Sequence, residues 1–335
     1  MNPFFYIIVP IYNVQAYLHQ CLDSLINQTY THFKAILIND GSTDLSGQIA
    51  QEYCDKDSRF VLITQQNAGL SMARNAGLAY IKNDLLSIRG GDNRYIVFVD
   101  SDDYIELDGL QCLATIISSN PSLDTIICNR AYHDTTLRDA IFFPTNDENK
   151  IFNYADILQQ YPHICVYSVW LFVYQCDFLF HTTHMFEPYI YHEDNLFISY
   201  LLTLTQRAYI ADTPIYHYRV SRQGSIMNTK TKVRFCDGVY SYFILTKRFY
   251  ELSHDAQHEI QRNYLWYWAS FFLKETLRGL QKYGYTKELR FNKSDLKTFY
   301  PFMDKKYRFC YHFPRIYGFP KKLRLWFMRY FSAKQ

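Results

Sequence analysis

Four short apolar runs, each followed at once by polar residues, set the pattern of the first 105 residues. They are rich in Ile, Val and aromatic side chains and cover residues 4–9, 33–38, 60–64 and 95–99. Continuous rather than alternating apolar runs are typical of strands that are buried on both faces. The segments between them carry apolar residues at helical spacing. Strands that alternate with helices predict an α/β fold: a Rossmann-like, mostly parallel sheet with flanking helices.

Turn and capping residues indicate where these helices begin. We expect Asn13 to cap the first helix, and Thr43 or Asp44 to cap the second. A third helix is expected from Gly69 to about residue 82. The segment 85–94 contains two consecutive glycines and is expected to be a surface loop.

Polar residues gather at the carboxyl ends of all four predicted strands. The groups are Tyr12-Asn13, Asp40-Gly41, Gln66-Asn67 and residues 100–103. In an open parallel sheet these ends meet at one edge, where ligands bind. The sequence therefore predicts a ligand site at this edge.

The last of these groups places Asp100, Asp102 and Asp103 within four residues. Such close carboxylates repel one another, and a hard divalent cation, which often also binds a diphosphate, would remove the repulsion. The alternative is a turn with helix-capping acids. The sequence has no P-loop and no GxGxxG fingerprint, so a few cationic side chains would have to help with phosphate charge. Arg74 is one candidate, and its alternative is an ordinary exposed helix charge.

Five blocks of sequence, in this order, resemble inverting family-two glycosyltransferases of GT-A fold, of the bacterial surface-glycan type. They span residues 4–108 with one departure, the segment 85–94, and weaker similarity continues to about residue 226. The blocks are Ile8-Val9-Pro10-Ile11-Tyr12-Asn13, Cys21-Leu22-Asp23-Ser24-Leu25 with Asn27-Gln28-Thr29, Asn39-Asp40-Gly41-Ser42-Thr43-Asp44, Gln66-Asn67-Ala68-Gly69-Leu70-Ser71 with Ala73-Arg74-Asn75-Ala76-Gly77, and Asp100-Ser101-Asp102-Asp103.

This resemblance implies a nucleotide-diphosphate sugar donor, most often a UDP-sugar, and a Mn²⁺ or Mg²⁺ ion. It assigns the contacts to base and ribose to Pro10, Tyr12 and Asn13, and the acceptor of a uracil hydrogen bond to Asp40. The remaining donor contacts are assigned to Asn67, Gly69, Arg74, Asp100 and Ser101. The metal ligand is Asp102, and Asp103 would aid the metal or the sugar hydroxyls.

His217 allows two interpretations. It could be a third metal ligand or a diphosphate contact, but a lone His in an aromatic strand is more often a packed, hydrogen-bonded residue. Downstream, Arg219, Arg222 and Ser225 could form a flap over the diphosphate, as the resemblance suggests, or an ordinary basic loop.

The pair Glu193-Asp194 is the candidate for the catalytic base. In direct displacement, an acceptor hydroxyl attacks the anomeric carbon, and one base on the acceptor side is needed. The resemblance places the base in this pair, with Asp194 as the base and Glu193 orienting the acceptor or its partner. The alternative is an acid pair that favours a helix N-terminus.

The aromatic residues divide the chain further. Of 31 Tyr, 26 Phe and 4 Trp, 13 lie in residues 1–110 and the other 48 follow. We expect a GT-A catalytic domain over 1–230, with a donor-nucleotide half (1–110) and an acceptor half (111–230). Residues 194–202 are expected to be helical and 215–220 to form a strand, whereas 111–165 cannot be ordered. Residues 231–335 are expected to be a mainly helical region, with helix over most of 238–282.

The charge distribution and the cysteine pattern indicate which partners and which cellular location to expect. The net charge of +3 argues against nucleic acid as a partner. Residues 301–335 hold nine Lys/Arg and one acid, which gives +8 and leaves −5 for the rest. This aromatic, basic tail suits an anionic membrane surface, or a solvated helix packed on the body.

The eight cysteines form no CxxC pair and suggest free thiols in a reducing compartment. The N-terminus resembles a strand, not a signal peptide. These features predict a cytoplasmic protein that is peripheral on the inner face of the cytoplasmic membrane.

These observations predict a transferase that moves a hexose or N-acetylhexosamine from a UDP-sugar to a saccharide or glycolipid acceptor. The pathway would be lipopolysaccharide, lipooligosaccharide, capsule or other surface-glycan synthesis. Two alternatives stay open. One is a nucleotidyltransferase that makes a nucleotide-sugar, although the triphosphate loop it needs is not found near the N-terminus. The other is a catalytically silent glycan-binding relative, which would have no need of Asp102 and Asp194.

Overall fold

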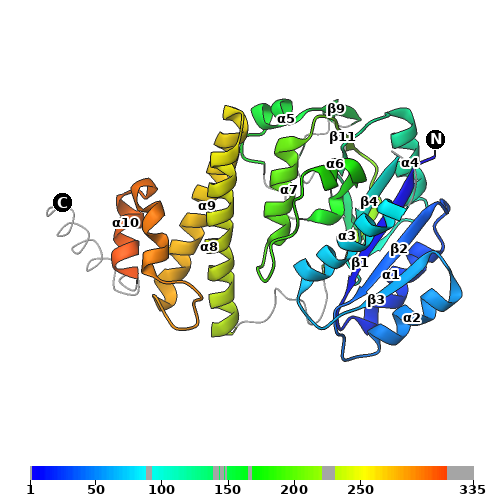
Figure 1. The fold of residues 1–335 in the computed structure, drawn as a ribbon, viewed down its shortest axis with the longest axis horizontal. Coiled ribbons are helices and arrows are strands. Elements are labelled where there is room, and N and C mark those ends of the chain that lie inside the picture. The colour runs from blue at the N-terminus through cyan, green and yellow to red at the C-terminus, as the bar shows by residue number, and fades with distance from the viewer. Residues whose placement is uncertain are drawn as a thin grey trace. The chain divides into compact units, whose positions relative to one another are not determined.

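The computed structural model describes residues 2–87, 93–138, 143, 147, 149–164, 168–220 and 231–314. The chain divides into two compact units (Figure 1). The first comprises residues 1–189 and 193–223, and the second comprises 190–192 and 224–335. The expected catalytic domain over residues 1–230 stays a prediction.

The first unit is built on an eight-stranded sheet with the strand order β3-β2-β1-β4-β10-β6-β11-β9. The donor half of the chain supplies β1 (Phe4–Ile11), β2 (Phe33–Asn39), β3 (Phe60–Thr64) and β4 (Arg94–Phe98), and their pairings are all parallel. The other strands are β6 (Thr125–Cys128), β9 (Lys150–Phe152), β10 (Phe172–Gln175) and β11 (Ala208–Ala211). Of these, β10 runs antiparallel to both β4 and β6. The predicted α/β fold with a mostly parallel first half is confirmed.

Helices flank this sheet, as expected (Figure 1). They are α1 (Gln15–Ile26), α2 (Ser46–Lys56), α3 (Leu70–Ser87), α4 (Gly109–Ser119), α5 (Tyr154–Gln160), α6 (Cys176–His181) and α7 (Glu193–Leu204). Helix α3 packs closely on β1, because a Cβ atom at Gly77 would lie 2.8 Å from Cγ2 of Ile8. This close approach brings the residues at the start of α3 to the carboxyl ends of the strands.

A second, four-stranded sheet joins distant parts of the first unit. Its order is β5-β12-β7-β8, from β5 (Tyr104–Ile105), β12 (Tyr216–Tyr218), β7 (Ala131–His133) and β8 (Thr136–Arg138). Strand β5 follows the acidic turn 100–103, and β12 pairs with it. The acceptor half of the chain is thereby attached to the acidic turn.

Several local expectations need correction. Val14, not Asn13, is the N-cap of α1, and Leu45 is the N-cap of α2, without a side-chain capping bond. Helix α3 continues to Ser87, so the first part of the expected loop 85–94 is helical, and residues 88–92 lie outside the described structure. The expected strand at 215–220 is shorter, and the expected helix at 194–202 is confirmed as α7.

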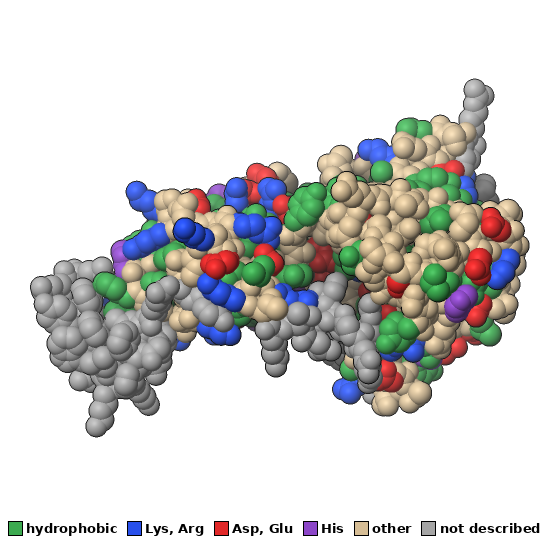
Figure 2. Space-filling model, turned by 90° about the horizontal axis from the view of Figure 1, so that it is seen from below, with side chains coloured by type: hydrophobic (Ala, Val, Ile, Leu, Met, Phe, Trp, Pro, Cys, Tyr) green, Lys and Arg blue, Asp and Glu red, His purple; other side chains and the backbone are tan. Residues whose placement is uncertain are grey.

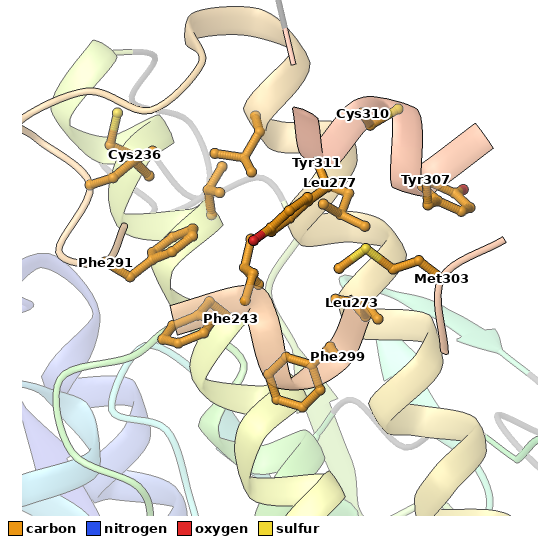
Figure 3. Close-up of a cluster of buried hydrophobic side chains, with 14 residues drawn as sticks. Cys236, Phe243, Leu273, Leu277, Phe291, Phe299, Met303, Tyr307, Cys310 and Tyr311 are labelled. Atoms are coloured by element: carbon orange, nitrogen blue, oxygen red, sulfur yellow. The ribbon is translucent and has the colours of Figure 1, made fainter. Parts of the chain in front are cut away.

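The second unit is helical, as expected, and has its own core (Figure 3). The expected helix over 238–282 consists of α8 (Lys232–Asp255) and α9 (Glu259–Tyr283), followed by the 3₁₀ segment η4 (Lys293–Phe302) and α10 (Lys305–His312). Buried side chains from all four elements pack together, among them Phe243, Leu277, Phe299 and Tyr311. The described start of the expected tail therefore packs its aromatic face on the unit. Residues 315–335 lie outside the described structure.

Within the described ranges, no helix is both long and apolar enough to cross a membrane. The seven cysteines in these ranges are free thiols, and Cys165 is not among the residues described.

Candidate functional site

The ends of β1 and β2 are joined by Asn13. Its side-chain Oδ1 accepts a hydrogen bond from the Thr43 backbone N–H at 2.8 Å, and its own N–H donates to the Ser42 hydroxyl at 3.2 Å. A positive φ of 50° turns the chain out of the strand at this residue. Beside it, Tyr12 is 46% exposed, whereas Pro10 is buried in β1. Tyr12 is therefore the aromatic ring at this strand end that a ligand can reach.

Asp40 is buried and clamps the loop after β3. Its Oδ1 accepts hydrogen bonds from Gln65 Nε2 at 2.7 Å and from the Ala68 N–H at 2.9 Å, and its Oδ2 accepts from the Gly69 N–H at 2.8 Å. A carboxylate offers about four acceptor positions, and these bonds use three of them. Asn67, in the clamped loop, is exposed. Asp40 therefore shapes the loops at this edge; one acceptor position is unused by this count, and the residue is only 3% exposed.

The acidic turn after β4 is held by Tyr216 of β12. The Tyr216 hydroxyl donates to Asp103 Oδ2 at 2.9 Å and accepts from the Asp100 N–H at 3.0 Å. The ring is fully buried and stacks on Trp170 with centroids 4.1 Å apart. Ser101 is also buried. Neither Tyr216 nor Trp170 could be selected from the sequence, because the paired strands are distant and no spacing links them.

Asp103 points into the protein. Besides Tyr216, its carboxylate accepts a hydrogen bond from the Arg219 N–H at 2.7 Å. Burial, reinforced by the charges of Asp102 and Asp100, raises the pKa of Asp103 to about 8. Both oxygens of Asp103 thus attach β12 to the acidic turn. The expected metal role of Asp103 does not match this environment.

Arg219 and His217 also act within the protein. Arg219 Nε donates to the Asp102 backbone carbonyl at 2.8 Å, while Arg222 and Ser225 of the expected flap lie outside the described residues. His217 Nε2 lies 2.7 Å from Glu106 Oε1, and its ring is stacked between Tyr104 and Tyr132. This packing matches the alternative interpretation of a packed strand residue, whereas the buried Nδ1 atom has no hydrogen-bond partner, so the metal-ligand role stays a prediction.

Arg74 is buried, so it is not the ordinary exposed helix charge that was the alternative interpretation. Its side chain is 3% exposed, and its two terminal nitrogens bind carboxylates on different elements. Nη2 donates to Asp100 Oδ1 at 2.8 Å, and Nη1 donates to Glu193 Oε1 at 2.7 Å. A buried guanidinium needs such partners, because an unpaired charge in the interior is costly. Arg74 therefore joins the end of β4 to the start of α7.

Asp194, the next residue in α7, has a different environment from Glu193. It is partly buried, and its Oδ1 accepts a hydrogen bond from the adjacent Asn195 N–H at 3.1 Å. Burial and the neighbouring Glu193 charge raise the pKa of Asp194 well above its usual value, and Arg74 opposes the shift. Of the two carboxylates, Glu193 is paired with Arg74, and Asp194 has a pKa raised chiefly by burial.

The residues at this edge fit a divalent cation only if the protein supplies one or two of its ligands. Across the described residues, no group of three or more His, Cys, Asp or Glu side chains is arranged to hold a metal. Mg²⁺-like cations often take only one or two protein carboxylates and complete their shell with water and substrate phosphates. Asp102, a partly buried carboxylate in the acidic turn, fits such a site with few protein ligands.

The mixed sheet, whose first four strands are parallel and end beside the acidic turn, is the arrangement expected for a GT-A fold. Solved structures support this fold. The S. aureus TarS 1–349 structure with UDP-GlcNAc superposes with a TM-score of 0.62 at 19% identity, covering 93% of this chain and 87% of that one. The mannosyltransferase PcManGT from Pyrobaculum calidifontis, with GDP-Man and Mn²⁺, gives a TM-score of 0.53 at 14% identity, covering 97% and 83%.

The model of the family described as "Glycosyl transferase family 2" matches residues 6–181, which is more than half of the chain. The chain therefore belongs to glycosyltransferase family 2. The relative named "Uncharacterized glycosyltransferase EpsJ" from Bacillus subtilis is 32% identical over 224 residues, which are 65% of this chain and 62% of EpsJ. The chain thus matches less than two thirds of this relative's length.

Proposed function

We propose that this family-two glycosyltransferase moves a hexose or an N-acetylhexosamine from a UDP-sugar to a saccharide acceptor, with inversion. The acceptor class is a lipopolysaccharide, lipooligosaccharide, capsule or other surface-glycan precursor. One observation carries the proposal: the buried Arg74 guanidinium binds Asp100 and Glu193 at 2.8 Å and 2.7 Å. This pairing keeps Glu193, and with it the adjacent Asp194, beside the acidic turn, to which the donor is assigned.

The proposed chemistry is a single displacement. Asp194 accepts the proton of the acceptor hydroxyl while that oxygen attacks the anomeric carbon and the nucleoside diphosphate leaves. Asp102 would hold a Mn²⁺ or Mg²⁺ ion, which when bound supplies positive charge for the leaving diphosphate. No protein acid is then required on the donor side. Unlike glycoside hydrolysis, which uses two carboxylates, this reaction needs only one.

The choice of a uridine donor rests on three supports. TarS, a neighbour in fold, is described with UDP-GlcNAc, and the family resemblance favours UDP-sugars. Asp40 keeps an acceptor position, which suits the imide N–H of uracil. In this proposal Pro10, Tyr12 and Asn13 line the base and ribose, and Asn67, Gly69 and Ser101 complete the donor site. Because PcManGT is described with GDP-Man, the experiment must include guanosine donors.

A donor panel tests the reaction class. With wild-type protein, we expect nucleoside diphosphate to be released from one UDP-sugar. Release should depend on added Mn²⁺ or Mg²⁺. EDTA should abolish it, because the proposed site at Asp102 offers the ion few protein ligands. Release is measured for UDP- and GDP-sugars side by side. Pyrophosphate released from a nucleoside triphosphate and a sugar phosphate would instead indicate the nucleotidyltransferase. The silent glycan-binding relative would release neither product.

Asp194→Asn tests the base. The change keeps the shape of the side chain but removes its proton affinity, so we expect transfer to fall by about 100- to 10,000-fold. Donor binding, measured by calorimetry, should stay unchanged. Asp177→Asn is the matched control, because Asp177 is the second residue of α6 as Asp194 is of α7, and it is exposed. Full transfer activity in Asp194→Asn would rule out this base.

The pH profile tests the same residue in the wild-type protein. A base must be ionised, so activity is lost as pH falls through its pKa. Because the pKa of Asp194 is raised, the acid limb of kcat/KM should lie clearly above pH 4, the ordinary value for Asp. An acid limb near pH 4 would contradict the assignment.

The C-terminal region is proposed to bind an anionic membrane surface from the cytoplasmic side. Residues 231–335 hold 21 Lys/Arg and eight acids, a net charge of +13, which leaves −10 for residues 1–230. Lys and Arg side chains gather over the helical unit on the face shown in Figure 2. Near the end of the described chain, Phe302 and Phe313 are 50% and 38% exposed. Basic and aromatic residues together suit the interface of a charged bilayer.

Replacing Lys321, Lys322 and Arg324 with Gln tests this partner. Each charge near an anionic surface contributes about 1 kcal/mol, so binding to phosphatidylglycerol-containing vesicles should weaken by about 100-fold. The control replaces three exposed lysines of the first unit, Lys56, Lys82 and Lys150. Equal vesicle binding by the two variants would contradict a membrane role for the tail. Truncation near residue 300 is unsuitable, because it removes buried core residues of α10.

A further inference from the structure

Arg74 and Asn75, consecutive in α3, both bind the segment that leads into α7. Arg74 bridges Asp100 and Glu193, as described above. The Asn75 amide pairs with the backbone of Phe186: Nδ2 donates to the Phe186 carbonyl at 2.8 Å, and Oδ1 accepts from the Phe186 N–H at 2.9 Å. The two side chains thus attach the acceptor half at two points, residues 186 and 193.

Aromatic packing makes this attachment stiff. The Phe186 ring stacks on Phe197 of α7, with centroids 3.9 Å apart and planes at 10°, and meets Phe98 of β4 edge-on at 5.5 Å. The Arg74 guanidinium lies 5.3 Å from the centroid of the same ring. Close-packed aromatic contacts allow little independent movement of the elements they join. The start of α7 is therefore fixed to β4 by charge, amide and ring contacts together.

We propose that Arg74 and Asn75 are positioning residues, which hold the base-bearing start of α7 in register with the donor-binding end of β4. This inference rests on the proposed function and gives Arg74 a different role from the nucleotide contact that the resemblance implied. Neither side chain touches the reacting atoms in this role. Arg74 acts through Glu193 and Asp100, and Asn75 acts through the backbone of Phe186.

The charges around Asp194 make the proposal measurable. The groups that face it are Glu193 on α7, Arg74 on α3, Asp100 after β4 and the buried Tyr174 on β10. Arg74 lowers the pKa of Asp194, and the carboxylates of Glu193 and Asp100 raise it. Removing Arg74 and removing the Glu193 charge should therefore shift the acid limb of the pH profile in opposite directions.

The first variant is Arg74→Met, which keeps the length of the side chain without its charge. We expect kcat to fall by about 100-fold, since a displacement of about 1 Å of a reacting group has this effect. The acid limb of kcat/KM should move to higher pH. Arg74→Lys should keep the limb near the wild-type position yet recover only part of kcat, because an ammonium lacks the planar fork that spans two carboxylates.

Two further variants keep the test decisive if Arg74→Met does not fold. Glu193→Gln should move the acid limb to lower pH, and Asn75→Ala should lower kcat without moving it. An acid limb that stays in place in Glu193→Gln, or wild-type kcat in Asn75→Ala, would overturn the proposal.

Arg59→Met is the matched control for a paired arginine, although Arg59 is only partly buried, with 22% of its side chain exposed. Arg59 pairs with Asp57 at 2.7 Å, donates to the Ile26 carbonyl and lies over the Phe33 ring, away from the acidic turn. It should lose stability but keep the wild-type kcat and acid limb. A shift in Arg59→Met equal to that in Arg74→Met would overturn the positioning role. If the wild-type protein itself transfers no sugar, the proposed function fails, and the variants are then not at issue.

Discussion

A guanidinium that is almost excluded from water requires carboxylates around it, and this requirement organises the site. Arg74 lies in α3, which is pressed onto β1 by the close approach at Gly77. Its two partners come from residues 100 and 193, which are distant in sequence. The burial of one charge therefore keeps the acidic turn after β4 close to the start of α7. Removing either partner would leave a charge uncompensated in the interior, which is far costlier than losing a surface ion pair.

At the other strand ends, too, polar residues are bound mainly by other groups of the protein. Asp40, Asn13 and Asp103 are polar residues of the family motifs, yet most of their hydrogen bonds are made within the protein. Each one holds a loop or strand beside the expected ligand. The loops at this edge are therefore shaped by hydrogen bonds within the protein, and preorganised dipoles of this kind would need no rearrangement in the proposed reaction.

The sequence predicted the parts of the fold that local patterns determine. The strands of the first 105 residues were located by continuous apolar runs, and α7 by its spacing and acidic start. The small sheet that holds Tyr216 against Asp100 and Asp103 was not predictable, because its strands are two or three residues long and the pairing of β5 with β12 spans about 110 positions. Arg74 and His217 were recognised as important, but their burial depends on partners that no spacing reveals. The net charge of +3 conceals a charge of −10 on residues 1–230 and of +13 on residues 231–335.

The proposed reaction is a single displacement at the anomeric carbon with one base on the acceptor side. The most direct measurement is the anomeric configuration of the new linkage, read from proton NMR couplings of the first product and compared with that of the donor sugar. Direct displacement predicts that the configuration is inverted. A linkage that retains the configuration of the donor would contradict direct attack assisted by Asp194.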